Sequence, residues 1–213
     1  MRSVFHKVDL RMNRPDPSTA VAVLQRLAQS YPQLFGPEPL PLKRGIYQDL
    51  LQAHAGDWDA ADLKQALSRH TRSGHYLNAV AAGRPRHDLN GQVVEPMAPE
   101  HVLQALVEVF RRRQGRSRED LTPRLLRRLA QAYEASGCTP DAYVALAARQ
   151  PEAVQALVER AMADVAARRA RDEALARAHA RSGLSAADFA EQYGVALADL
   201  NRALSRAEPQ AQV

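Results

Sequence analysis

Residues 41–50 are Pro41-Leu42-Lys43-Arg44-Gly45-Ile46-Tyr47-Gln48-Asp49-Leu50, and they open the stretch that decides the predicted fold. It continues with Leu63-Lys64-Gln65-Ala66-Leu67 and Tyr76-Leu77, and it closes with Gly83-Arg84-Pro85-Arg86-His87-Asp88-Leu89-Asn90-Gly91. From Leu63 to His87 the chain has five Lys or Arg, three His and one Tyr, but no Asp or Glu. Unopposed cations around an aromatic ring are typical of surfaces that bind a polyphosphate backbone. The alternative is a solvated helix face, which accounts for most runs of charge.

These four phrases, in this order and at this spacing, resemble the ProQ/FinO family of bacterial RNA chaperones. The family pattern has a Pro-Leu-Lys-x-Gly-Ile start, an aromatic-Leu pair and an Arg-x-Asp-Leu-Asp/Asn-Gly hairpin, and the resemblance covers about residues 19–113. It implies a compact, mainly helical domain with one small β-hairpin. It also implies binding of structured RNAs, as a stem with a single-stranded 3′ tail, which would stabilise small RNAs and promote RNA–RNA pairing. The expected partners are small RNAs and the 3′ ends of messenger RNAs.

The resemblance also implies which residues contact RNA. Lys43, Lys64 and Arg86 take the places of residues that pair with phosphates, and Tyr76 would line a pocket for the RNA 3′ end. A half-buried ring that anchors its own helix is an equally consistent role for Tyr76. Thr71 and Ser73, at a predicted helix N-terminus, could present backbone N–H groups to a phosphate. The full expected set is Lys43, Lys64, Arg69, Thr71, Arg72, Ser73, His75, Tyr76, Arg84 and Arg86.

Three positions depart from the family pattern. Ser68 stands where an Arg is expected, Gly74 where an aromatic is common, and His75 where a basic residue often occurs. Arg69 and Arg72 are the neighbours that could compensate, although a shift of one residue along a helix turns a side chain by about 100°. The departures therefore bear on affinity and RNA preference more than on the fold.

Composition agrees with an acidic partner. The formal net charge is +5 and the pI is about 9.7. Residues 1–115 contain 15 Lys or Arg against 11 Asp or Glu, whereas residues 116–213 contain 14 against 13. The positive excess therefore belongs to the half that carries the resemblance, although net charge alone does not identify the partner.

Nothing in the sequence indicates catalysis. The seven histidines form no i, i+4 pair, and Cys138 is the only cysteine, so neither a zinc site nor an internal disulfide is expected. No phosphate-cradling or dinucleotide-binding glycine motif is present. We expect no catalytic residue, no metal and no cofactor. Residues 1–13 lack the apolar region of a signal peptide and no window resembles a membrane span, which predicts a cytoplasmic protein without a membrane partner.

The predicted fold class is mainly α: a ProQ/FinO-like domain with one β-hairpin, followed by an all-α C-terminal extension. The expected divisions are a flexible leader at 1–17, the RNA-binding domain at 18–113, a linker at 114–120, a helical extension at 121–207 and a tail at 208–213. Ser18 or Thr19 is expected to cap the first helix, and Asn90-Gly91 to form a two-residue hairpin turn. Further helices are expected at about 44–53, from Asp59, after residues 71–74 and from Pro99.

The C-terminal half contains a faint repeat with an offset of 46 residues. Ser136-Gly137-Cys138-Thr139 aligns with Ser182-Gly183-Leu184-Ser185, and Tyr143 aligns with Phe189. Residues 183–204 also resemble a helix-turn-helix, although Asn201 and Arg202 are nearly the only candidate base-reading residues. The alternative functions are therefore DNA binding through this segment, or a scaffold that binds proteins through the long Ala/Arg-rich helix predicted at 151–181.

Overall fold

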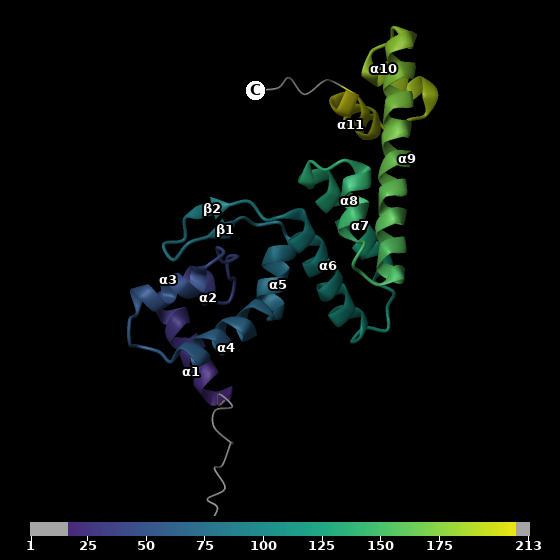
Figure 1. Ribbon diagram of the computed structural model, residues 1–213. Coiled ribbons are helices and arrows are strands. Elements are labelled where there is room, and N and C mark those ends of the chain that lie inside the picture. The colour runs from purple at the N-terminus through teal and green to yellow at the C-terminus, as the bar shows by residue number, and fades with distance from the viewer. Residues whose placement is uncertain (1–16, 208–213) are drawn as a thin grey trace, which may run out of the picture. The chain divides into compact units, whose positions relative to one another are not determined.

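The computed structural model describes residues 17–207, and its contacts divide the chain after Leu121 into an N-terminal unit and a C-terminal unit (Figure 1). The fold is mainly α, as predicted. Over residues 17–207, no helix combines the length and the apolar character that crossing a bilayer requires. The predicted leader at 1–17, apart from Pro17, and the predicted tail at 208–213 lie outside the described residues.

The N-terminal unit contains six helices and a two-stranded sheet within its described residues. α1 packs on α4 and α5 packs on α6, and fully buried leucines such as Leu27, Leu50, Leu63 and Leu103 fill the core between these elements. The helices are α1 (Pro17–Ser30), α2 (Pro32–Phe35), α3 (Ile46–Ala53), α4 (Ala60–Thr71), α5 (Gly74–Ala81) and α6 (Pro99–Gln114), and the strands are β1 (Arg86–His87) and β2 (Val93–Glu95).

The helix starts agree with the expected capping residues at some positions and differ at others. The Asp59 carboxylate accepts the N–H groups of Ala61 and Asp62 and so caps α4. The first helix is described from Pro17 and includes Ser18 and Thr19, so neither of these residues precedes it as a cap. α3 begins at Ile46 rather than near Arg44, because Gly45 precedes it with a φ of +83°.

The predicted hairpin is present, but its turn is longer than expected. β1 and β2 pair antiparallel, with Arg86 opposite Glu95. The predicted two-residue Asn90-Gly91 turn is wrong, because the Asp88 N–H donates to the Gln92 carbonyl at 3.0 Å. The Asp88 carboxylate accepts the N–H groups of Asn90 and Gln92, each at 2.9 Å, and so closes a loop of residues 88–92. The Asp88 side chain therefore decides the loop length here, rather than the local preference of Asn-Gly for a two-residue turn.

The extended connector at residues 36–41 leads into a short parallel pairing with β1. Leu42 forms an isolated parallel bridge with His87. The Lys43 N–H donates to the His87 carbonyl and the His87 N–H donates to the Pro41 carbonyl, both at 2.8 Å. The Pro-Leu-Lys segment is thus fixed against the hairpin although more than 40 residues separate them in sequence.

The described residues of the C-terminal unit form helices joined by short connections. α7 and α8 lie along the N-terminal part of α9, and α10 and α11 lie along its C-terminal part (Figure 1). The 31-residue α9 is thus shared by both groups. The elements are α7 (Thr122–Ser136), α8 (Pro140–Leu146), α9 (Glu152–Ser182), α10 (Ala186–Tyr193) and α11 (Leu197–Ala207).

The structure confirms the predicted repeat. Ser136 and Ser182 each end a helix, and each hydroxyl donates to the carbonyl three residues earlier at 2.7 Å. Each hydroxyl also accepts the N–H two residues later, at 3.1 and 3.2 Å. Gly137 and Gly183 both have a φ of +67°. The hydroxyl of the next Thr or Ser then caps the following helix in both copies.

The repeat extends to the cores of the two copies. Tyr133 and Tyr143 make an edge-on ring contact at 5.4 Å, and His179 and Phe189 make the equivalent contact at the same distance. Tyr143 and Phe189 are both buried. Each copy is therefore a helix, a Ser-Gly break, a short capped helix and a third helix, and α9 is the third helix of one copy and the first of the other.

Candidate nucleic-acid interface

Lys43 lies on the extended segment that pairs with β1. Its side chain is 33% exposed, and its ammonium group forms a 2.7 Å ion pair with Asp49 of α3. A partly exposed pair of this kind contributes at most about 1 kcal/mol. Lys43 can therefore exchange Asp49 for a phosphate without a large loss of stability.

Tyr76 is buried beneath the predicted RNA-binding stretch. The residue is only 6% exposed, and its ring centroid lies 5.2 Å from that of the His70 ring in an edge-on contact. Its hydroxyl accepts the Leu42 N–H at 3.0 Å. Burial raises the pKa of this hydroxyl, and the Leu42 N–H and the nearby Arg86 guanidinium oppose that shift. Tyr76 thus joins α5 to the segment that carries Lys43.

Arg86 is enclosed by groups of the protein. Its side chain is 14% exposed, and it donates to the Leu42 carbonyl at 2.8 Å and to His101 Nδ1 at 3.3 Å. Its Nε lies 3.4 Å from a Glu95 carboxylate oxygen, which is an ion pair without hydrogen-bond geometry. These partners join β1 to Leu42, β2 and α6. Both backbone polar groups of Leu42 are thus held by the predicted site residues Tyr76 and Arg86.

The last turn of α4 carries the predicted residues Arg69, Thr71 and Arg72. Thr71 ends α4 rather than opening α5, and its hydroxyl donates to the Leu67 carbonyl at 2.9 Å. The exposed Arg72 turns back along the helix, and its Nε donates to the Ser68 carbonyl at 3.0 Å. The Arg72 guanidinium therefore lies over Ser68, the position at which the family pattern has an arginine.

Ser73 is the N-cap of α5, and its Oγ accepts the Tyr76 N–H at 3.2 Å.

Three predicted cations, Lys64, Arg69 and Arg84, are exposed, and no acceptor contacts their side chains among residues 17–207. Lys64 and Arg69 are five residues apart on α4, so they project about 140° from each other and do not share one face. The predicted residues thus form no single flat surface on α4.

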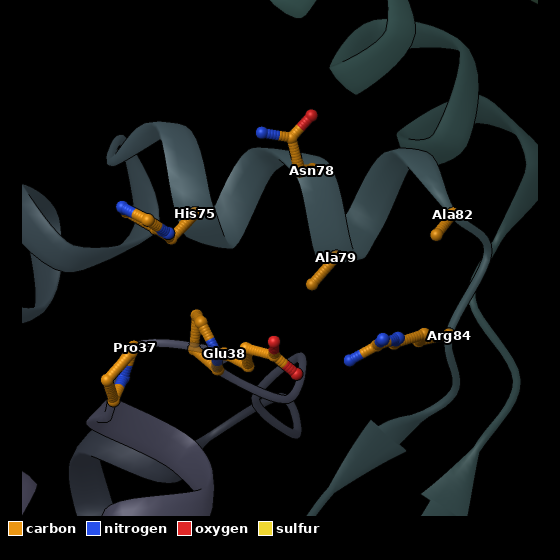
Figure 2. Close-up of a pocket in the computed structure, with 8 residues that line it drawn as sticks. Pro37, Glu38, His75, Asn78, Ala79, Ala82 and Arg84 are labelled. Carbon is orange, nitrogen blue, oxygen red and sulfur yellow. The ribbon is translucent and has the colours of Figure 1, made fainter.

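A cavity of about 230 Å³ lies between the connector and one side of α5 (Figure 2). It contains the predicted residues His75 and Arg84, both exposed, whereas Tyr76 is not in its wall. Pro37 and Glu38 form the opposite side, across from α5. The lining residues are Pro37, Glu38, Pro39, His75, Asn78, Ala79, Ala82 and Arg84.

Comparison with known proteins identifies the N-terminal unit. Residues 18–122 match the ProQ/FINO family. The N-terminal unit is a ProQ/FinO family domain. The boundaries of this match include the Pro-Leu-Lys segment, the α4–α5 region, the hairpin and all of α6.

Curated relatives match only part of their own length. An RNA chaperone ProQ of Shewanella oneidensis is 34% identical over 137 residues, which are 62% of this chain and 62% of that protein. An RNA chaperone ProQ of Histophilus somni is 36% identical over 91 residues, which are 41% of this chain and 43% of that protein. A crystal structure of a FinO-like RNA chaperone from Neisseria meningitidis is 31% identical, covers 42% of this chain and 93% of its own, and has a TM-score of 0.39.

The ProQ/FinO domain also contains functional candidates that the sequence did not indicate. Glu38 enters the cavity from a proline-rich connector, and its only sequence signal was the fixed extended geometry that neighbouring prolines impose. Glu95 and His101 were not singled out, because their role as partners of Arg86 depends on contacts between distant segments. No group of three or more His, Cys, Asp or Glu side chains within the described residues is arranged to hold a metal ion.

The arginine triplet 111–113 at the end of α6 makes contacts within the ProQ/FinO domain. Arg111 and Arg112 both pair with Glu108, at 2.9 and 2.6 Å. Arg112 also donates to the Arg72 carbonyl at 2.7 Å, and Arg113 donates to Asn78 Oδ1 at 3.1 Å. The triplet therefore joins α6 to the α4–α5 turn and to α5. The Glu108 carboxylate lowers the net charge of the triplet, and the Arg72 and Asn78 oxygens occupy donors of Arg112 and Arg113.

The helix-turn-helix-like segment of the C-terminal unit offers few base-reading groups. α10 and α11 are joined by a turn at Gly194, which has a φ of +63°. Asn201 and Arg202 are exposed on α11, but the Arg202 guanidinium is paired with Asp199 at 2.7 Å. A helix that reads DNA bases needs several free donors. The described residues of α10 and α11 therefore offer few of the donors that base reading needs.

Proposed function

We propose that the ProQ/FinO domain binds structured RNA at a stem with a single-stranded 3′ tail. The chain would act as an RNA chaperone that stabilises small RNAs and promotes RNA–RNA pairing. The observation that carries the proposal is the family match over residues 18–122, which includes every segment with an unpaired cation described above. The curated relatives named RNA chaperone ProQ support the same activity. The proposed role is binding, and it requires no catalytic residue.

The contacts divide the predicted residues into two groups. Lys64, Arg69 and Arg84 are exposed and without acceptors among the described residues, so they are available for phosphates. Arg86 and Tyr76 are mostly buried and hold Leu42, so we assign them the positioning of Lys43 rather than direct contact with RNA. An A-form stem is recognised mainly through its shape and backbone, which suits cations spread over a curved surface.

The position of Arg72 supports its acting in place of the arginine that the family pattern has at position 68. Its guanidinium is bound to the Ser68 carbonyl, one helical turn before its own Cα. The remaining guanidinium N–H groups stay exposed there and can donate to a phosphate. Ser73 places the first turn of α5 beside it, where unsatisfied backbone N–H groups also favour an anion.

Salt dependence of binding provides the first test. The full chain is titrated with a terminator-like hairpin that has a 3′ tail, a blunt version of the same hairpin and duplex DNA. Three or four phosphate contacts give a log–log slope of affinity against salt of about −2 to −4. The tailed hairpin should bind more tightly than either control. A slope near zero, or equal affinity for duplex DNA, would show that the basic stretch is an ordinary solvated surface.

Binding in cells provides the second test. RNA crosslinked to the full chain is sequenced, and the positions of the crosslinks are compared with transcript ends. We expect small RNAs and messenger 3′ ends to be enriched. Crosslinks spread evenly along abundant transcripts would contradict the proposed preference for a stem with a free 3′ tail.

A further inference from the structure

We propose that the cavity between the connector and α5 holds one guanine base from the single-stranded part of the bound RNA, and that Glu38 selects it. This inference rests on the RNA binding proposed above. It adds a site and a base preference that concern Glu38, a residue outside the basic stretch.

The size of the cavity suits one flat heterocycle. Its volume is about 230 Å³, whereas sites for drug-sized ligands occupy about 300–1,000 Å³. The exposed Pro37 borders it on the connector side and the exposed Ala82, at the end of α5, on the other, while Pro39 and Ala79 line it but are themselves buried. Apolar walls of this kind can contact both faces of a base, while its sugar and phosphate remain outside in water.

The two charged groups of the cavity face each other without touching. Figure 2 shows the Glu38 carboxylate and the Arg84 guanidinium pointing toward one another across the cavity. No ion pair joins them, and neither side chain has an acceptor or donor partner elsewhere in residues 17–207. A planar group between them would therefore meet an acceptor on one side and donors on the other.

Glu38 is out of place in a surface that binds only phosphates. A carboxylate repels a phosphate, and it lies here in the same cavity as Arg84 and His75. A carboxylate is useful in RNA binding where a base offers it N–H groups. The Watson–Crick edge of an unpaired base in single-stranded RNA is free to do so.

Guanine matches both groups of the cavity. Its N1–H and N2–H groups can donate together to the Glu38 carboxylate, and its O6 and N7 can accept from the Arg84 guanidinium. Uracil has a carbonyl oxygen on each side of its single N–H, so the carboxylate disfavours it. Adenine and cytosine each offer an amino group beside a ring nitrogen acceptor, so each forms fewer bonds to Glu38.

The surrounding contacts fix the connector backbone and Asn78 around the cavity before the base arrives. The Gly36 N–H donates to the Pro32 carbonyl and the Leu40 N–H to the Gln33 carbonyl, both at 2.9 Å, so the connector is fixed at both ends. On α5, Asn78 donates to the Gly74 carbonyl and accepts from Arg113. A cavity with fixed walls loses little conformational entropy on binding.

The test uses the full chain and hairpins with a uridine 3′ tail. One guanosine is moved through the tail, position by position, and affinity is measured by fluorescence anisotropy. At one position we expect the guanosine to raise affinity about tenfold over uridine, a typical discrimination for a well-matched base contact. Replacing that guanosine by inosine, which lacks the N2 amino group, should remove most of the gain.

Glu38→Gln is the matching protein variant, because its amide can accept only part of the guanine edge. We expect it to reduce the guanosine preference to less than about threefold and to respond little to inosine. Glu119→Gln removes the same charge from an exposed residue outside the cavity and should keep the preference. Glu38 is exposed and unpaired, so thermal melting of both variants should match the wild type.

The outcomes distinguish this inference from the proposed function. If the all-uridine tail binds but no guanosine position is preferred, the guanine site is wrong and RNA binding stands. If Glu38→Gln raises affinity for every RNA equally, Glu38 only repels phosphates and the inference is overturned. If no tailed hairpin binds at all, the proposed function itself fails.

Discussion

The hydroxyl of Tyr76 accepts the backbone N–H of Leu42 at 3.0 Å, although 34 residues separate them in the chain. Arg86 donates to the carbonyl of the same Leu42 at 2.8 Å. The segment with Lys43 is therefore held from two sides. Disturbing either contact should act on stability and on RNA binding together.

Tyr76→Phe tests the anchoring role of Tyr76. The variant keeps the ring but leaves the buried Leu42 N–H without an acceptor, which should lower the free energy of unfolding by about 1–2 kcal/mol. Tyr76→Ala also creates a cavity and should lower it by about 3–5 kcal/mol. Chemical denaturation measures both. Where the variants remain folded, tailed and blunt hairpins should lose affinity equally; a loss confined to tailed RNA would instead place Tyr76 at the 3′-end pocket.

Lys64→Ala and Arg86→Ala should separate phosphate contact from support of the fold. Lys64 is exposed, so its removal should change stability by less than about 0.5 kcal/mol while weakening all structured RNAs similarly. Arg86→Ala leaves the Leu42 carbonyl and Glu95 without this partner and should cost about 1–3 kcal/mol of stability. Melting and binding are measured on the same preparations. An Arg86→Ala protein as stable as the wild type would contradict the assigned role.

An exchange between positions 68 and 72 tests whether Arg72 replaces the expected family arginine. Arg72→Ser should weaken binding of hairpin RNA, because the guanidinium over Ser68 is lost. Adding Ser68→Arg to that variant should restore most of the affinity, since it returns the charge to the same place. The control is Ser68→Lys in the Arg72→Ser background, which returns charge without the planar fork. No recovery in either double variant would show that Arg72 acts elsewhere.

The buried His70 makes the stability of the ProQ/FinO domain dependent on pH. Burial lowers the pKa of His70 from 6.5 to about 4, opposed by a hydrogen bond with the Leu34 backbone. Between these values the unfolded chain binds the proton and the folded chain does not, so stability falls as pH drops from about 6.5 to 4, by up to about 3 kcal/mol. Denaturation at several pH values measures this loss. His70→Phe should remove most of it, and an unchanged profile in that variant would assign the loss to other groups.

The repeat provides a natural control for Tyr143. Its hydroxyl is buried without a hydrogen-bond partner among the described residues, and burial raises its pKa to about 12. The equivalent residue of the second copy is Phe189, which has no hydroxyl. Tyr143→Phe should therefore leave stability unchanged or raise it by about 1 kcal/mol, whereas Tyr143→Leu, which loses the ring contact with Tyr133, should lower it. A clear loss in the Phe variant would reveal a bound partner for the hydroxyl.

Local sequence signals predicted much of the fold. Asp59 and Pro99 mark helix starts through chemistry that acts within one turn, and the structure confirms both. The Ser-Gly breaks predicted the repeat because each one ends a helix through hydrogen bonds to residues close by in the sequence. The prediction of a two-residue hairpin turn was wrong because the Asp88 carboxylate, not the Asn-Gly pair, decides the loop length.

The candidate site was less predictable, because burial and pairing depend on distant segments. From the sequence, Arg86 and Lys64 were both predicted to pair with phosphates. Only the contacts of Arg86 with Leu42, Glu95 and His101 distinguish the two residues. The cavity with Glu38 lies between two segments that meet only in the folded domain. Charge along a chain indicates which residues are basic, but it does not show which of them remain free.

The shared helix α9 sets the rotation of one repeat copy relative to the other within the C-terminal unit. Arg168 of α9 and Arg206 of α11 both approach Glu134 of α7, at 2.8 and 4.0 Å, so the two copies meet at one carboxylate. Deleting one residue from the middle of α9 would rotate the second copy by about 100° and shift it by about 1.5 Å. Each copy would keep its own ring contact and Ser-Gly break, while the contacts to Glu134 would separate. The number of residues in α9 between the two ring contacts is therefore constrained by the approach of Arg206 to Glu134.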